Sequence, residues 1–256
     1  MQERTFTCDG DGGKGNGRAG NRMEQLFAEV TELCRDDKFL HSVMKKYHYA
    51  EEEYSTIKNM AEQMLPCLKS EAGWQDSDFG KTFPEGGQSF FAVGITLGKG
   101  IDELQEQYLK NGLLTESYVI EVLSSELLLK SYRSYTEWVA KHRDLHVARL
   151  YFLGSEISDS KALQPESTVT SLQQWLHLEQ LPEVLKKLEL PVTCNEAYCM
   201  IPKKSVVFYA ALTLDSSVKC AGICLGCGRR DCPNRMEEKE AFSRSINRSE
   251  TVESLC

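Results

Sequence analysis

The sequence predicts an α+β fold, because segments with strand character stand on both sides of a helical centre. The first such segment is the β-rich run 89–97, which two glycines follow. The centre is the helical pattern of 113–142, the longest in the chain, and the run 204–214 comes after it. This order favours an α+β domain over a parallel doubly wound sheet, in which strands and helices alternate along the chain.

The first third of the sequence predicts helices that lead into a strand. Within 23–68, apolar residues recur at intervals of three and four, which is the spacing of a buried helix face. Residues 74–87 are rich in Asp and Gly, so we expect a loop there. The run 89–97 then has strand character, and the chain turns helical at 101–108.

The central helix should bury one stripe of apolar side chains against the core. That stripe consists of Val119, Val122, Leu123, Leu127, Leu128 and Tyr132. After the helix we expect a short strand at 149–152 and one or two helices within 168–190. Strand character follows at 192–200 and 204–214, interrupted by Pro202.

His142 and His146 lie four residues apart, which would place them on one face of a continuing helix. Two histidines without a third ligand do not make a metal site, so we expect a solvated surface there.

The chain of 256 residues is long enough for one full-sized domain with its own core and appendages. A helical pattern begins at Met23, directly after a glycine-rich stretch, which makes Met23 a candidate for the natural start. We divide the chain into a glycine-rich N-terminus expected to be disordered (1–22), an N-terminal helical segment (23–84), an α+β domain (85–215), a four-cysteine segment (216–235) and a charged tail (236–256).

Charge and composition narrow the classes of function. A formal net charge of −8 argues against a general nucleic-acid binder, because binding phosphates takes a basic surface. No apolar run approaches the roughly 20 residues that span a bilayer, so we expect no membrane segment. Ten cysteines without a secretory signal fit the reducing cytoplasm better than a disulfide framework. Six of them are scattered and expected to be free thiols: Cys8, Cys34, Cys67, Cys194, Cys199 and Cys256.

The other four cysteines form one compact run, and thiolates so close together suit a metal or iron–sulfur site. They are Cys220, Cys224, Cys227 and Cys232, interleaved with glycines that allow sharp backbone turns. A compact run that closes with Cys-Pro favours a [4Fe–4S] cluster, whereas structural zinc usually joins two separated pairs and remains the alternative. The first three have the spacing of radical S-adenosylmethionine enzymes, but too few residues follow Cys232 to build the barrel of those enzymes.

Two segments resemble a known family. Residues 196–206 read Glu-Ala-Tyr-Cys-Met-Ile-Pro-Lys-Lys-Ser-Val, and residues 94–104 read Gly-Ile-Thr-Leu-Gly-Lys-Gly-Ile-Asp-Glu-Leu. Both resemble the S-adenosylmethionine-binding activation domain of cobalamin-dependent methionine synthase and its smaller stand-alone relatives. The similarity spans about residues 89–214, roughly half of the chain.

This resemblance implies a C-shaped α+β domain with a twisted antiparallel sheet that binds S-adenosylmethionine. In the family, the domain helps to return oxidised cob(II)alamin to methylcobalamin, using one electron from a reductase and the methyl group of S-adenosylmethionine. The expected partners are therefore a corrinoid protein or a methionine synthase-type methyltransferase, and an electron donor such as flavodoxin or ferredoxin. The domain binds and orients its cofactors, so no side-chain nucleophile is expected.

The resemblance also implies which residues bind the cofactor. The family holds the methionine part with an Arg-x-x-x-Gly-Tyr loop, and this chain offers Arg149 and Gly154 with one extra residue between them and no Tyr after the glycine. Arg149 would take the carboxylate, or it is an ordinary strand-end arginine. Tyr198 and Tyr209 would pack against the ligand, or they belong to the core. Glu196 is either a ligand contact or a strand-edge carboxylate.

Taken together, the sequence predicts a stand-alone corrinoid reactivation factor with the four-cysteine cluster as electron relay. Lysine and arginine residues around the thiols would offset the negative charge of a cluster. The competing hypothesis is a non-enzymatic module that binds a corrinoid protein and carries a structural zinc. A methyltransferase proper is disfavoured, because no glycine-rich cofactor turn follows a convincing strand.

Overall fold

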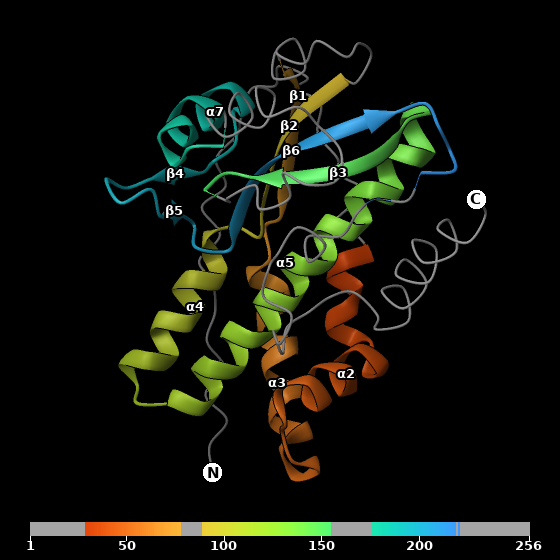
Figure 1. Ribbon diagram of the computed structural model, residues 1–256. Coiled ribbons are helices and arrows are strands. Elements are labelled where there is room, and N and C mark those ends of the chain that lie inside the picture. Colours follow the sequence, from red (N-terminus) through yellow and green to blue (C-terminus); the bar gives the residue numbers. More distant parts are fainter. Residues whose placement is uncertain (1–28, 78–88, 155–175, 219, 221–256) are drawn as a thin grey trace, which may run out of the picture.

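The computed structural model describes residues 29–77, 89–154, 176–218 and Cys220. It is an α+β structure in which helices pack against a four-stranded antiparallel sheet (Figure 1). The predictions for residues 1–22, for the tail 236–256 and for three of the clustered cysteines concern positions outside the described residues.

Within the described ranges, five α-helices carry most of the helical structure. They are α2 (Asp37–Tyr47), α3 (Tyr54–Met64), α4 (Lys99–Lys110), α5 (Leu114–Arg143) and α7 (Leu181–Leu188). Short 3-10 helices stand beside them: η1 (Leu33–Arg35), η2 (Glu51–Glu53), η3 (Leu65–Cys67) and η5 (Leu178–Gln180). The six stripe residues predicted for the central helix are all buried in α5, so the prediction of this helix and of its buried face is confirmed.

The sheet has the order β1-β2-β6-β3, and each strand is antiparallel to its neighbour. The strands are β1 (Glu71–Ser77), β2 (Ser89–Thr96), β3 (His146–Phe152) and β6 (Ser205–Thr213). A separate small hairpin consists of β4 (Thr193–Cys194) and β5 (Met200–Ile201). The strands expected at 89–97, 149–152 and 204–214 are therefore present.

Each face of the sheet has its own core, because successive side chains of a strand point to opposite faces. One face packs against α2 to α5 and forms the main core, which includes Val93, Ile95 and Phe208. The other face packs against α7 and forms a second core, which includes Phe90 and Tyr209. The main core also takes in buried residues from the N-terminal helices, so residues on both sides of position 84 build it together.

The docking of α7 depends on two glycines in the sheet. A Cβ on Gly94 would lie 2.5 Å from the Cδ1 atom of Leu190, and one on Gly73 would lie 3.1 Å from the backbone oxygen of Leu188. The two missing side chains thus leave room for the end of α7 to approach β1 and β2.

The expected loop at 74–87 is wrong over its first residues, because β1 continues to Ser77 and pairs with β2 along its whole length. β1 is an edge strand, so Gln75 and Asp76 can face solvent there. Because these residues are polar, the composition of the segment indicated a loop, and the strand was not predicted.

Three further expectations are corrected. The strand expected at 192–200 consists of two short strands with a turn between them. His142 and His146 do not share a helix face, because α5 ends at Arg143, Asp144 adopts a left-handed conformation, and His146 opens β3. Cys67 is disulfide-bonded and so not a free thiol.

The described helices include none that is both long enough and apolar enough to cross a membrane.

Tyr135 generates a prediction about stability. Its side chain is 0% exposed, and its hydroxyl has no hydrogen-bond partner in the described part of the chain. A buried hydroxyl without a partner costs free energy, so Tyr135→Phe should raise the free energy of unfolding by about 1–2 kcal/mol. Urea unfolding at neutral pH measures the change.

Tyr54→Phe is the matched control for Tyr135→Phe. The Tyr54 hydroxyl donates to the Asp37 carboxylate at 2.5 Å on the surface, so its loss should leave stability unchanged or lower it slightly. A Tyr135→Phe protein less stable than the wild type would contradict this view of the core.

Candidate functional site

The strand register brings two of the predicted residues, Arg149 and Tyr209, onto one face of the sheet together with Tyr151. Arg149 on β3 lies opposite Ala211 of β6, and Tyr151 lies opposite Tyr209. Because residues two apart on a strand share a face, Arg149, Tyr151 and Tyr209 all belong to the face that carries the second core. We call this the α7 face of the sheet.

Arg149 is held by an aromatic contact. Its guanidinium carbon lies 5.2 Å from the centroid of the Tyr151 ring, a cation–π distance. The side chain is half-buried, and within the described residues it forms no ion pair. A guanidinium has five N–H donors in a fixed plane, so one held against a ring can still grip a carboxylate with two parallel hydrogen bonds.

The tyrosines of this face are neutral phenols. Burial, and next the negative charge of Glu183, raise the pKa of Tyr209 to about 12. Burial likewise raises the pKa of Tyr151, although the Arg149 charge opposes the effect. Tyr209 is only 3% exposed, so it serves as a core residue of the sheet. Neither phenol can act as a base near neutral pH.

Gly154 follows β3 at a position that requires glycine. Its φ is +79°, and a Cβ there would lie 2.9 Å from side-chain atoms of Leu178. Its N–H donates to the backbone oxygen of Leu176 at 2.6 Å. The end of β3 is thus fixed beside the residues that lead into η5.

Glu196 and Tyr198 lie in the turn between β4 and β5. The turn is organised by Asn195, whose side-chain oxygen accepts hydrogen bonds from the N–H groups of Ala197 at 3.0 Å and Cys199 at 2.9 Å. The Tyr198 N–H donates to the Asn195 backbone oxygen at 2.9 Å. Tyr198 is half-buried against the second core, whereas Glu196 is exposed.

The structure therefore brings Arg149, Tyr198 and Tyr209 to the α7 face and its core. Gly154 lies at the end of the same strand as Arg149, and Glu196 lies in the same turn as Tyr198.

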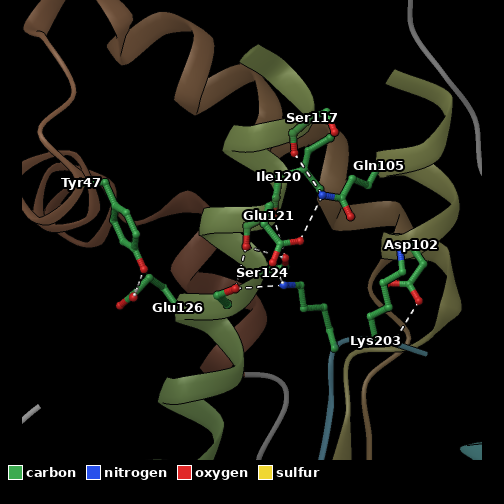
Figure 2. Close-up of polar contacts among 11 residues, drawn as sticks. Tyr47, Asp102, Gln105, Ser117, Ile120, Glu121, Ser124, Glu126 and Lys203 are labelled. Carbon is green, nitrogen blue, oxygen red and sulfur yellow. Dashed lines mark hydrogen bonds and ion pairs between the residues drawn. The ribbon is translucent and has the colours of Figure 1, made fainter. Parts of the chain in front are cut away.

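A second polar cluster, which sequence patterns did not predict, joins α4, α5 and the start of β6 (Figure 2). Lys204 is 7% exposed; its Nζ forms an ion pair with the Glu121 carboxylate and lies 2.9 Å from the Ser125 Oγ. Gln105 Nε2 donates to the other Glu121 oxygen at 3.1 Å. We call Lys204, Glu121, Gln105 and Ser125 the lysine clamp.

Neighbouring contacts extend this attachment of β6 to the helices. The Lys203 N–H donates to the Asp102 carboxylate of α4 at 2.8 Å. On the other side of α5, the buried Glu126 carboxylate accepts from Lys46 Nζ at 2.7 Å and from the Tyr47 hydroxyl at 2.9 Å, and Figure 2 shows the contact with Tyr47. Each of these carboxylates contacts a donor on another element, which indicates a role in positioning elements, although the buried Oδ1 of Asp102 has no hydrogen-bond partner among the described residues.

Of the predicted metal ligands, only Cys220 belongs to the described residues; Cys224, Cys227 and Cys232 lie outside them. Cys220 is half-buried and packs against the main core, and burial raises its pKa to about 11. A search of the described part for groups of three or more His, Cys, Asp or Glu side chains that could hold a metal finds none.

Comparison with protein-family models gives no match for this chain, and comparison with curated proteins gives none either. Its function must therefore be argued from its own residues.

The lysine clamp predicts how stability depends on pH. Burial tends to raise the pKa of Glu121, but the hydrogen bond and charge of Lys204, with the Gln105 contact, outweigh it and lower the pKa below the ordinary 4.5. A pKa that is lower in the folded state stabilises the fold above the ordinary value, and that stability is lost as the pH falls through the folded pKa. Glu121→Gln should therefore lower the free energy of unfolding by about 1–3 kcal/mol at neutral pH. This range is reduced for solvent screening, because the Glu121 side chain is 42% exposed.

The difference between the wild type and Glu121→Gln should shrink as the pH falls below the ordinary pKa of 4.5 and through the lower folded pKa, because the wild-type carboxyl then becomes protonated too. Urea unfolding at neutral and acidic pH measures it. Glu106→Gln is the control, because the Glu106–Lys110 pair is exposed at both ends and should contribute about 0–0.5 kcal/mol. Equal losses in the two variants at both pH values would contradict the clamp.

Proposed function

We propose that the protein is a stand-alone relative of the methionine synthase activation domain. It binds S-adenosylmethionine at the α7 face and assists the reductive reactivation of a corrinoid cofactor that a partner protein holds. An acidic carrier such as flavodoxin or ferredoxin supplies the electrons, and they reach the partner through the four-cysteine segment.

The observation that carries the proposal is the position of Arg149. It stands on the α7 face, half-buried and held against the Tyr151 ring, without a carboxylate partner in the described part of the chain. A half-buried guanidinium with free donors is suited to the carboxylate of an amino-acid ligand. An antiparallel α+β fold agrees with the coarse fold that the family resemblance implies.

The chain's own residues would bind and orient the ligand. Arg149 would fix the carboxylate, and the neutral phenols beside it offer no nucleophile at neutral pH. This fits a reaction whose methyl acceptor is a metal on the partner, because such a step needs correct placement of the donor more than acid–base catalysis.

Cys220, Cys224, Cys227 and Cys232 would hold the metal group. Four thiolate donors suit a [4Fe–4S] cluster or zinc equally in number. A bound cluster would supply single electrons. Cys220 lies only a few residues beyond the end of β6 and contacts the main core, so a metal group there would be anchored to the sheet.

That anchoring also favours a second candidate function. A metal fixed against a core is the usual arrangement of a structural zinc, which would make the protein a non-enzymatic module that docks to a corrinoid protein.

Arg149→Ala tests the binding site. Losing two charge-assisted hydrogen bonds should weaken S-adenosylmethionine binding by about tenfold to a hundredfold in isothermal titration calorimetry. Arg149→Lys should recover only part of the affinity, because an ammonium lacks the planar fork.

Arg143→Ala is the matched control for Arg149→Ala. Arg143 also lies over an aromatic ring, with its guanidinium carbon 4.2 Å from the centroid of Trp74, but Trp74 packs against the main core. Binding should be unchanged in this variant. Unaltered affinity in Arg149→Ala, or no binding by the wild type, would reject the site.

Metal analysis separates the two candidate functions. Protein purified without oxygen should contain about four iron atoms and equal sulfide per chain, and iron should be lost in Cys227→Ser. Stoichiometric zinc without iron would instead support the docking module and remove the electron relay.

A further inference from the structure

Two exposed apolar side chains lie next to each other at the start of α5. Leu114 is 66% exposed and Tyr118 is 54% exposed. They are four residues apart in the helix, so they share one face of it. Single exposed apolar residues are ordinary, but large apolar side chains that gather on a surface often mark a contact with another molecule.

Two further tyrosines adjoin Tyr118, one at the end of α2 and one in the turn after it. Burial, the Tyr118 phenol and the Glu53 charge, in that order, raise the pKa of Tyr49 to about 12. Burial also raises the pKa of Tyr47, as do Glu126 and the phenols of its two neighbours. Effects of this kind fade over short distances, so the three phenols lie close together. We call Tyr47, Tyr49, Leu114 and Tyr118 the tyrosine patch.

Polar atoms at the tyrosine patch have unused capacity for hydrogen bonds. The Tyr49 hydroxyl is buried and has no hydrogen-bond partner among the described residues. Glu126 is 8% exposed, and the Lys46 ammonium and the Tyr47 hydroxyl both donate to its Oε1 atom. Its Oε2 atom accepts no hydrogen bond from the described part of the chain. Buried polar atoms without partners cost free energy, which a ligand with matching donors would recover.

The charge beside the tyrosine patch is negative. The helix η2, which follows the turn at Tyr49, consists of three glutamates. Glu51 lies 3.6 Å from the Nε2 atom of His41. Glu52 and Glu53 form no ion pair within the described ranges. Lys46 does not compensate them, because its ammonium is already paired with the buried carboxylate at 2.7 Å.

We propose that the tyrosine patch is a docking surface for an arginine-bearing amphipathic helix of a partner protein. A guanidinium stacks on a phenol ring and donates both to phenol oxygens and to carboxylates such as Glu53, so arginine matches the aromatic, polar and charged features together. Apolar side chains on the same face of the partner helix would cover Leu114 and Tyr118.

This inference does not depend on the proposed function. Tyr47 and Tyr49 pack against the main core, whereas α7 and Arg149 belong to the other face of the sheet (Figure 1). The docking surface and the proposed ligand site therefore lie on different sides of the molecule, and each can be tested without the other.

Fluorescence anisotropy with the full chain at physiological salt tests the docking. The probe is a fluorescein-labelled designed peptide that carries leucine and arginine on one face of a helix. Its matched control carries citrulline in place of arginine, which keeps the length of the side chain and removes the charge. The citrulline peptide should bind at least about tenfold more weakly, and Leu114→Ser and Tyr118→Ser should each weaken the arginine peptide by about tenfold.

Leu214→Ser is the matched control on the protein. Leu214 is 82% exposed and directly follows β6, whose last residue pairs with the start of β3, just beyond the end of α5. It lies far from the start of α5, so its loss should leave peptide binding unchanged. All three substitutions replace exposed side chains, and thermal unfolding shows that each variant is folded.

Three results would overturn the docking surface: a wild type that does not bind the arginine peptide, equal binding of the arginine and citrulline peptides, or unchanged binding by Tyr118→Ser. Two other results would reject the partner helix and assign another occupant. A dimer in sedimentation velocity that Tyr118→Ser converts to a monomer would assign the patch to a second copy of the chain. Displacement of the probe by a peptide of residues 1–22, at lower concentration than the unlabelled arginine peptide needs, would assign it to the chain's own N-terminal segment.

Discussion

The pairing of β6 with both of its neighbours is the constraint on which the rest of the structure depends. β6 lies between β2 and β3, and eight of its nine residues are buried. Phe208 points to the main core, and the next residue, Tyr209, points to the second core. A slip of one residue would exchange these environments and separate Tyr209 from its cross-strand neighbour Tyr151, so the packing of both cores selects one register.

The lysine clamp fixes the start of the same strand. Lys204 immediately precedes β6 and forms its ion pair with Glu121 in the first third of the long helix. Burying an ammonium is unfavourable without a partner, so the clamp defines one position of β6 on α5. The lysine clamp, shown in Figure 2, therefore also affects the α7 face. It positions β6, and the register of β6 brings the residues of that face together.

Local patterns predicted the elements whose signals are contained in a few neighbouring residues. The periodicity of α5 and the β-rich run of β2 are of this kind, and both elements lie within a residue or two of their expected bounds. β1 was missed because an edge strand tolerates polar residues such as Asp76. The lysine clamp joins residues 83 positions apart, and no spacing rule connects them. Arg149 and Tyr209 likewise share a face because of the register of β3 on β6. This register cannot be predicted from the residues of either strand alone.

The hydrogen bond from Gly154 to Leu176 has a consequence for how such a chain can change over evolution. The backbone departs from the end of β3 and returns at Leu176, within one hydrogen bond of its point of departure. The sheet therefore sets no particular number of residues between these two points. A change in that number would leave the register of β3 on β6 intact, so the length of the chain can vary at this point during evolution without a new fold.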